Sequence, residues 1–302
     1  MAIVKNGTLW KDTDGNEIHA HGGYIIWHEG YYYWYGEDRR ENWYVSCYRS
    51  QNLTDWEFRN HVLTTESETC SYRVRTKQIL VNADGSKVNL ERPKVLYNKK
   101  TGKFVMWVHF ENGKDYQDAA AAVAICDTPD GDFTYLGHFN PYGYMSRDCT
   151  LFQEEDGTAY FLSAARDNAD LHVYRLTEDY LNVEKVVHRL WQGEYREAPA
   201  VLKIEGRYYM MTSACTGWAP NQGKYASAAA MEGEWSMLRE IGDETTYHSQ
   251  PAFLLEHDGK YLYFGDRWGG NGDCYFASSY VVYPLIVENG ELKLQYVEEI
   301  EL

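Results

Sequence analysis

The amino-acid sequence predicts an all-β fold, a five-bladed β-propeller that spans residues 1–302 as one domain. Three observations predict it. One type of segment recurs five times, the interval between recurrences is long enough for four strands, and aromatic residues, which favour strands, make up 16% of the chain. Convincing amphipathic helix patterns are few, and only YRLTEDYL, at 174–181, invites that comparison.

Each recurring segment contains a polar residue, a short apolar run, a turn with glycine, and a second run dense in aromatics, which is typical of a β-hairpin. In chain order the segments are HGGYIIWHEGYYYWYGE, ERPKVLYNKKTGKFVMWVHF, DCTLFQEEDGTAYFLSA, EAPAVLKIEGRYYMMTSA and QPAFLLEHDGKYLYFGDRW. Their leading polar residues are His21, Glu91, Asp148, Glu197 and Gln250. The turn glycine follows nine residues later in four segments (Gly30, Gly157, Gly206, Gly259), and two extra residues move it to Gly102 in the second.

The stretches between hairpins supply the outer strands of each blade. The leading residues are 70, 57, 49 and 53 positions apart, and 52 residues follow the last one. The candidate outer strands lie in 43–58, 121–137, 169–187 and 224–238. A β-sandwich with coincidental hairpins is the alternative, and the regular offset from polar residue to glycine favours the propeller.

Charge and cysteine content limit the function. The formal charge of −16, from 29 Lys and Arg against 45 Asp and Glu, argues against nucleic acid or an anionic membrane as a partner. Neither a membrane span nor a signal peptide is evident, so we expect a cytoplasmic protein as the chain stands, or a secreted or periplasmic one if a leader has been removed. Six scattered cysteines without a C-x-x-C pair suit reduced thiols.

The leading residues of the five hairpins are the candidate functional site. A propeller places the start of each innermost strand around the central channel, so these positions converge in space. Three carboxylates, a histidine and an amide around one cavity are costly for folding, because like charges raise one another's pKa and lose hydration. The alternative is that they hydrogen-bond neighbouring strands and fill the channel.

Clustered carboxylates in an aromatic-lined cleft are typical of glycosidic bond cleavage. One carboxylic acid must stay protonated near neutral pH, and nearby negative charge is the usual means. Glu197 and Asp148 lead adjacent blades, so Asp148 is placed to retain the proton on Glu197. The residues therefore predict Glu197 as the general acid.

These motifs, together with SQNLTDW at 50–56, resemble glycoside hydrolase family 43, whose members are inverting five-bladed propeller enzymes. The resemblance covers essentially the whole chain. It implies that Glu197, in REAP, is the acid and that Asp148, in SRDCTLF, tunes its pKa. The family's usual base is an Asp that opens the first blade in an A-D-P context, but here Ala20 is followed by His21 and Gly22.

The motifs AHGG, ERPKVLYN, SRD, REAP, CTGW and HSQ resemble the exo-β-1,3-galactanase branch of that family. This resemblance implies that Glu91 and Gln250 join the acid, and that Gln250 is the base, acting as an imidic acid. The residues alone favour Glu91 as base and Gln250 as the group that positions water. We favour Gln250 on the HSQ resemblance.

The resemblance implies a galactan 1,3-β-galactosidase that releases galactose from β-1,3-galactan or arabinogalactan. The alternatives are an α-L-arabinofuranosidase or β-xylosidase of the same family, and a non-catalytic sugar-binding propeller. Candidate substrate-binding residues are His21, Glu37, Tyr116, Thr216, Trp218 and Asp266.

Histidines near the start of the chain invite a metal hypothesis. His19 and His21 project to one face of a strand, but no third ligand follows at a characteristic spacing. We therefore expect no metal site and no required cofactor, although the resemblance allows a structural calcium ion on the propeller axis. The expected partner is an oligo- or polysaccharide, with neither nucleic acid nor membrane, and we expect a monomer.

Overall fold

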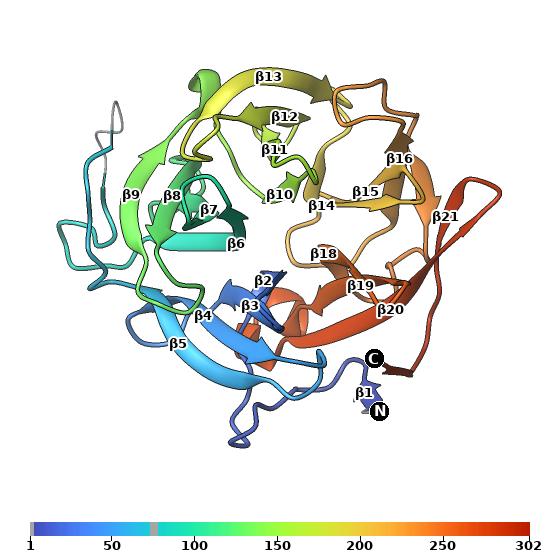
Figure 1. Cartoon of the computed structure of the whole chain (residues 1–302), viewed down its shortest axis with the longest axis horizontal. Coiled ribbons are helices and arrows are strands. Elements are labelled where there is room, and N and C mark those ends of the chain that lie inside the picture. The colour runs from blue at the N-terminus through green and yellow to red at the C-terminus, as the bar shows by residue number, and fades with distance from the viewer. Residues whose placement is uncertain (1–2, 73–77) are drawn as a thin grey trace.

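Five four-stranded antiparallel sheets surround a central axis in the computed structural model, which describes residues 3–72 and 78–302 (Figure 1). The predicted five-bladed β-propeller is confirmed. Each sheet is a meander in which consecutive strands pair, with the first strand innermost.

The strands of each blade follow in chain order. Blade 1 contains β2 (His21–His28), β3 (Tyr31–Glu37), β4 (Trp43–Ser50) and β5 (Glu57–Thr64). Blade 2 contains β6 (Asn89–Asn98), β7 (Lys103–Glu111), β8 (Ala120–Cys126) and β9 (Thr134–Phe139). Blade 3 contains β10 (Cys149–Gln153), β11 (Ala159–Ala165), β12 (Asp170–Leu176) and β13 (Val183–Leu190). Blade 4 contains β14 (Arg196–Ile204), β15 (Arg207–Ala214), β16 (Gly223–Ala228) and β17 (Arg239–Ile241). Blade 5 contains β18 (Gln250–His257), β19 (Lys260–Arg267), β20 (Ser279–Glu288) and β21 (Glu291–Leu294).

The hairpin turns form where the sequence predicts them. All five turn glycines have positive φ angles. In the first hairpin Glu29 also adopts a left-handed conformation, with φ 47° beside φ 88° at Gly30, and two such residues make the turn that matches the twist of paired strands.

Both ends of the described chain meet beside blade 5. β1 (Ile3–Lys5) pairs antiparallel with β22 (Glu299–Glu301), and Figure 1 shows the two termini close together. Asn6 extends this link, because its side-chain amide donates to the backbone oxygens of Val282 and Val297 at 2.9 and 3.0 Å.

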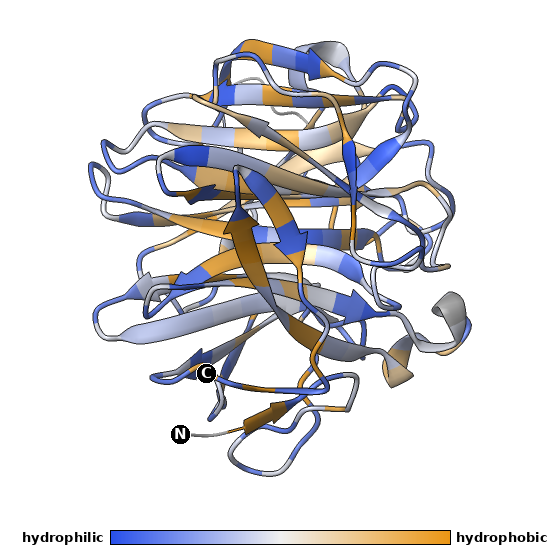
Figure 2. Cartoon of the chain, turned by 90° about the vertical axis from the view of Figure 1, so that its right-hand side faces the viewer, coloured by the Kyte–Doolittle hydropathy of each residue, from blue (hydrophilic) through white to orange (hydrophobic). Residues whose placement is uncertain are grey.

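The hydrophobic core lies between neighbouring blades. Trp34 of blade 1 packs against Tyr280 of blade 5 with ring centroids 4.9 Å apart, and Trp107 of blade 2 packs against Phe161 of blade 3 at 4.5 Å. Figure 2 shows hydrophobic residues concentrated along the strands and hydrophilic residues in the loops. Much of the aromatic surplus therefore serves blade packing, where such ring pairs add to the stabilisation from buried area.

The segment 174–181 is not helical. β12 continues to Leu176, and a turn follows in which the Thr177 amide donates to Asn182 O at 2.8 Å. Tyr174 and Leu176 are buried two positions apart, the period of a strand. The helices in the described ranges are all short 3₁₀ helices, at Pro141–Gly143, Gly269–Gly272 and Tyr275–Ala277. None of them has the length or hydropathy of a membrane-crossing helix.

Bulges interrupt three innermost strands directly after the leading residue. The pairing register shifts between His21 and Tyr24, between Glu91 and Lys94, and between Glu197 and Ala200. In each case the residue after the leading one is left-handed, with φ 56° at Gly22, 56° at Arg92 and 49° at Ala198. A bulge bends the strand and changes the direction of the side chains beside it, so these positions depart from the alternation of a regular sheet.

Candidate active site

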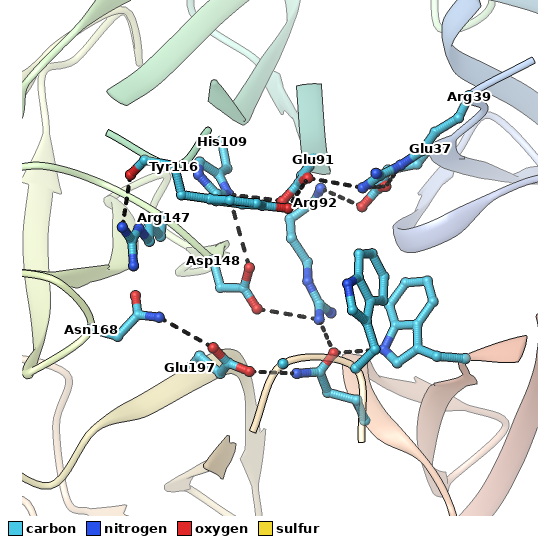
Figure 3. Close-up of a pocket in the computed structure, with 14 residues that line it drawn as sticks. Glu37, Arg39, Glu91, Arg92, His109, Tyr116, Arg147, Asp148, Asn168 and Glu197 are labelled. Carbon is cyan, nitrogen blue, oxygen red and sulfur yellow. Dashed lines mark hydrogen bonds and ion pairs between the residues drawn. The ribbon is translucent and has the colours of Figure 1, made fainter. Parts of the chain in front are cut away.

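A cleft of about 170 Å³ opens at the axis, where the innermost strands begin (Figure 3). Seven of the predicted site residues line it: Glu37, Glu91, Tyr116, Asp148, Glu197, Trp218 and Gln250. Four blades contribute a leading residue to this lining, as the propeller geometry requires.

Glu197 is held by two side-chain amides. Asn168 Nδ2 donates to its Oε2 at 3.2 Å, and Gln250 Nε2 donates to its Oε1 at 3.0 Å. Burial, and after it the negative charge of Asp148, raise the pKa of Glu197 to about 8, although Arg92 and the hydrogen bond from Gln250 act to lower it. Glu197 therefore carries a proton at neutral pH, which general acid catalysis requires.

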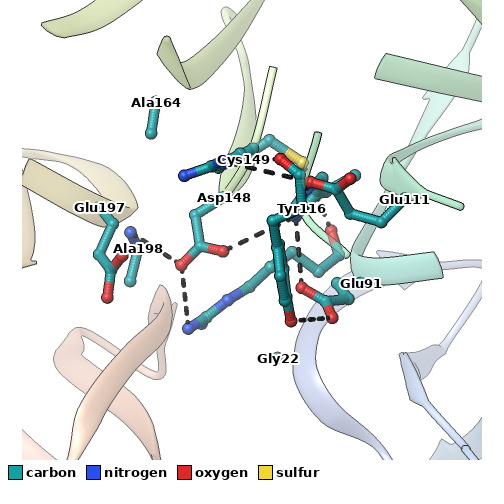
Figure 4. A network of polar contacts seen from close by, with 12 residues as sticks. Gly22, Glu91, Glu111, Tyr116, Asp148, Cys149, Ala164, Glu197 and Ala198 are labelled. Atoms are coloured by element: carbon teal, nitrogen blue, oxygen red, sulfur yellow. Dashed lines mark hydrogen bonds and ion pairs between the residues drawn. The ribbon is translucent and has the colours of Figure 1, made fainter. Parts of the chain in front are cut away.

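Asp148 lies beside Glu197 and is oriented from two directions (Figure 4). The backbone amide of Ala198 donates to Asp148 Oδ2 at 3.2 Å, and the guanidinium of Arg92 lies 3.2 Å from the same oxygen. The left-handed bulge at Ala198 is what turns this amide toward Asp148. The strand that carries the acid thus also fixes the carboxylate that retains its proton.

Gln250 makes four hydrogen bonds. Its amide nitrogen donates to Glu197 and, at 2.9 Å, to Ser213 Oγ. Its amide oxygen accepts from Arg92 and, at 2.8 Å, from the indole nitrogen of Trp268. Every amide atom is satisfied, so the orientation of the side chain is fixed with its nitrogen toward the acid.

Glu91 lies on the other side of Asp148 from Glu197 (Figures 3 and 4). Its Oε1 accepts from Arg39 and from the Tyr116 hydroxyl, both at 2.9 Å, and its Oε2 lies 3.4 Å from His109 Nδ1. Burial alone would raise the pKa of Glu91, but His109 and Arg39 hold it well below its usual range. Glu91 is therefore ionised in the folded protein at neutral pH.

His109 is a buried cation in the lining of the cleft. Its Nε2 lies 3.0 Å from Glu111 Oε1, and although burial opposes the charge, Glu111 and Glu91 raise the pKa of His109 to about 9. Glu91, His109 and Asp148 offer ligand atoms within 4.8 Å of one another. They do not fit a calcium ion, because calcium prefers oxygen ligands and His109 is protonated at neutral pH.

Three of the predicted substrate-binding residues lie outside the cleft lining. His21 Nδ1 lies 3.1 Å from Asp266 Oδ1, and both side chains are about 1% exposed. The other oxygen of Asp266 accepts from the backbone amide of Gly22 at 3.0 Å, so this pair supports the bulge of blade 1. Thr216 Oγ1 donates to Ala219 O at 2.6 Å within an exposed turn.

An aromatic wall closes one side of the cleft. Trp218 packs edge-on against Trp268 with ring centroids 4.7 Å apart, and Trp268 stacks on Tyr275 at 5.8 Å. Arg39 lies 4.6 Å from the Tyr275 ring centroid and 5.4 Å from that of Trp218. Such faces suit the apolar side of a sugar ring.

Comparison with known proteins places the chain in a family. Residues 18–252 match the family model described as glycosyl hydrolases family 43. The chain belongs to glycosyl hydrolase family 43. Comparison with curated protein sequences gives no match.

Solved structures of family 43 enzymes are similar over almost the whole chain. An exo-β-1,3-galactanase from Clostridium thermocellum is 46% identical with a TM-score of 0.89, over 98% of this chain and 66% of that one. An exo-β-1,3-galactanase from Phanerochaete chrysosporium, solved with galactose, is 34% identical with a TM-score of 0.86, over 99% of this chain and 68% of that one. A family 43 β-1,3-galactosidase, solved with galactodeoxynojirimycin, is 32% identical with a TM-score of 0.85, over 98% and 99%. The chain thus spans about two thirds of the length of the first two.

Seven residues of this family 43 cleft escaped the sequence analysis: Arg39, Arg92, His109, Arg147, Asn168, Gly217 and Trp268. Arg92 and Arg147 adjoin leading residues, and His109 and Trp268 stand at hairpin ends, so position within the repeat could have indicated them. Asn168 lies in a turn after the third hairpin, where no pattern marks it.

Proposed function

We propose that this family 43 enzyme is an exo-acting galactan 1,3-β-galactosidase, which releases terminal galactose from β-1,3-galactan or arabinogalactan with inversion. The observation that carries the proposal is the buried carboxyl group of Glu197, with a pKa of about 8, in the cleft of a chain that is 46% identical to an exo-β-1,3-galactanase. The α-L-arabinofuranosidase and β-xylosidase alternatives have no comparable support among these neighbours. A sugar-binding propeller without activity would have no use for the retained proton.

Glu197 is the proton donor in this proposal. Without protonation the leaving group would be a sugar alkoxide, which leaves poorly. A carboxylic acid must therefore protonate the glycosidic oxygen as the bond breaks. Asp148 keeps that proton on Glu197 until the substrate arrives. Asn168 and Gln250 fix the direction in which the carboxyl points.

Water activation is best supported at Glu91. Inversion places water between the base and the sugar, so the two carboxyl groups stand about 6.5–9.5 Å apart. The hydrogen bond from Gln250 to Glu197 favours a position for Gln250 on the acid's side of the cleft. Glu91 leads a strand two blades away, the largest separation that five blades allow, and it is ionised, although the charges of His109 and Arg39 that keep it ionised also lower its basicity. We therefore assign the base to Glu91 and the orientation of the acid to Gln250, although the family resemblance assigns the base to Gln250.

The test is incubation with β-1,3-galactan, an aryl arabinofuranoside and an aryl xyloside in parallel, with the released monosaccharides measured over time. We expect galactose from the galactan as the first and main product. Release of arabinose or xylose at a higher rate would reject the assigned specificity. Longer oligosaccharides among the first products would reject the exo mode of attack.

A further inference from the structure

Arg147 connects the two loops that hold the acid and the proposed base. Its Nη2 donates to the backbone oxygen of Tyr116 at 2.7 Å and lies 2.8 Å from Asp167 Oδ1. Its guanidinium also lies 5.8 Å from the centroid of the Tyr116 ring. Tyr116 belongs to the connection between β7 and β8, and Asp167 to the turn between β11 and β12. One side chain therefore spans two blades at the rim of the cleft.

Each of these loops presents a side chain to one of the two glutamates. The Tyr116 hydroxyl donates to Glu91 Oε1 at 2.9 Å. On the other loop, Asn168, next to Asp167, donates to Glu197 Oε2 at 3.2 Å. Figure 3 shows Arg147 between Tyr116 and Asn168 on the side of the cleft where both loops lie.

The Asn168 turn needs external support. Arg166, Asp167 and Asn168 are all left-handed, with φ angles of 52°, 60° and 63°. Three such residues in succession are strained without glycine, and they persist only where surrounding contacts over-determine them. Within the turn, the Arg166 guanidinium pairs with Asp170 at 2.9 Å. From outside the turn, Met145 Sδ accepts from the Asp167 amide at 2.8 Å, and the contact from Arg147 to Asp167 links the turn to the Tyr116 loop of blade 2.

We propose that Arg147 is a positioning residue that couples the Tyr116 loop to the Asn168 turn, and so sets the placement of Glu91 and Glu197 relative to each other. Arg147 directly precedes Asp148, and its backbone amide donates to Ala164 O at 2.9 Å, so the guanidinium projects from a fixed point. The N–H groups of a planar guanidinium point in fixed directions, whereas the three N–H groups of a lysine ammonium rotate at the end of a flexible stem and fix neither partner. Its role in turnover rests on the proposed function, whereas its effect on Glu197 does not.

The first test is a double-mutant cycle on kcat with Tyr116→Phe and Asn168→Ala, made in the wild type and again with Arg147→Lys. We expect Arg147→Lys alone to lower kcat by about tenfold to a hundredfold, because small misplacements of reacting groups cost that much. The two other substitutions should be non-additive in the wild type and additive with Arg147→Lys. Additive effects in both backgrounds would overturn the proposal.

The second test does not need activity. Infrared spectroscopy follows the carboxyl band of Glu197, identified by its loss in Glu197→Gln, as the pH is raised. Arg147→Lys should raise the titration midpoint, because a loosened Asn168 stabilises the ionised carboxylate less. Arg59→Lys is the matched control, since Arg59 joins Glu57 and Asp130 away from the cleft and should leave the midpoint unchanged. An unchanged midpoint in a folded Arg147→Lys would overturn the proposal.

A second variant, at the exposed end of the Arg147–Asp167 contact, tests the proposal even if Arg147→Lys does not fold. Asp167 is 75% exposed, so Asp167→Glu should fold normally, keep the negative charge, and raise the same midpoint by less because it displaces the carboxylate that Arg147 contacts. If Asp167→Glu and wild type titrate identically, Arg147 does not act through the turn. An inactive wild type with a midpoint that responds to Arg147→Lys would reject the galactosidase proposal and leave this one standing.

Discussion

Gln250 donates a hydrogen bond to Glu197 at 3.0 Å, so the amide that leads blade 5 touches the proton donor itself. A hydrogen bond to the ionised form lowers the pKa of a carboxyl group, whereas burial and Asp148 raise that of Glu197. A carboxylate at position 250 would repel the ionised acid. An amide instead orients the acid without adding charge.

Glu197→Gln should abolish cleavage of β-1,3-galactan while the fold is kept, because glutamine cannot protonate the leaving oxygen. General acid catalysis contributes on the order of 10² to 10⁴ in rate. An aryl galactoside with a good leaving group should lose much less activity. Released galactose and aryl alcohol measure the two rates, and circular dichroism checks the fold. Equal losses on both substrates would remove Glu197 from the acid's role.

The activity should fall as the pH rises above about 8, since Glu197 must be protonated to act and its pKa is about 8. Below that value this group imposes no loss. Gln250→Ala removes a hydrogen bond that lowers the pKa of Glu197, so its alkaline limb should lie at higher pH than that of the wild type. Profiles of kcat/KM from pH 5 to 10 measure both limbs. If the activity of Gln250→Ala falls at the same pH as that of the wild type, or at a lower pH, the result would contradict the effect of the Gln250 hydrogen bond on the pKa of Glu197.

The same pKa predicts a dependence of stability on pH. The pKa of Glu197 rises from 4.5 to about 8 on folding, so the folded state binds this proton more tightly than the unfolded chain does. The resulting stabilisation is complete below about pH 4.5 and is lost as the pH rises through about 8. Glu197→Gln escapes that loss, so its Tm should exceed the wild-type value at pH 9 by several degrees more than at pH 4. Calorimetry at the two pH values tests this, and a constant difference would contradict it.

Hairpins and leading residues could be predicted from the sequence because their signals are local. The D-G and E-G turns and the polar residue nine positions before each glycine fix where a strand starts, and the propeller then brings those starts together. His21 shows the limit of that reasoning. It leads its strand as Glu91 and Glu197 lead theirs, yet its ring pairs with Asp266 and stacks on Tyr280 at 4.8 Å, outside the cleft.

The supporting residues of the cleft could not be predicted, because they depend on contacts between loops of different blades. Arg39 reaches Glu91 of the next blade, and Asn168 reaches Glu197 from a strained turn. Neither position belongs to the repeat that revealed the fold. The sequence also had no signal for which face of the acid Gln250 would touch, since that depends on the donors Arg92 and Trp268.

Trp218→Ala should weaken substrate binding more than it slows chemistry. Trp218 lines the cleft and touches neither Glu197 nor Glu91 among the described contacts, so loss of its ring removes a stacking face. We expect KM to rise about tenfold with kcat changed much less, in line with the energy of aromatic contacts. Trp10→Ala, which alters an indole packed on Tyr280 away from the lining, is the control. A fall in kcat with KM unchanged would assign Trp218 to the chemistry instead.

The identity of the base can be decided by chemical rescue. If Glu91 activates water, Glu91→Ala leaves space on the face opposite Glu197, and azide ion should attack the anomeric carbon there. The carbon–nitrogen bond forms as the glycosidic bond breaks, the leaving oxygen takes the proton of Glu197, and the product is a galactosyl azide of inverted configuration. Loss of the base should lower kcat by about 10² to 10⁴, and azide should restore part of it.

Gln250→Ala should behave differently in the same assay. It removes the hydrogen bond that orients the acid, so we expect measurable activity, lowered about tenfold to a hundredfold, that azide does not restore. Gln250→Glu should not improve on the wild type, because a second carboxylate beside Glu197 would raise the pKa of one of the pair. Proton NMR of the first-formed galactose supplies the stereochemistry. The opposite result is a folded Gln250→Ala that is inactive until azide is added, together with a Glu91→Ala that stays active. It would make Gln250 the base and Glu91 a ligand for a sugar hydroxyl.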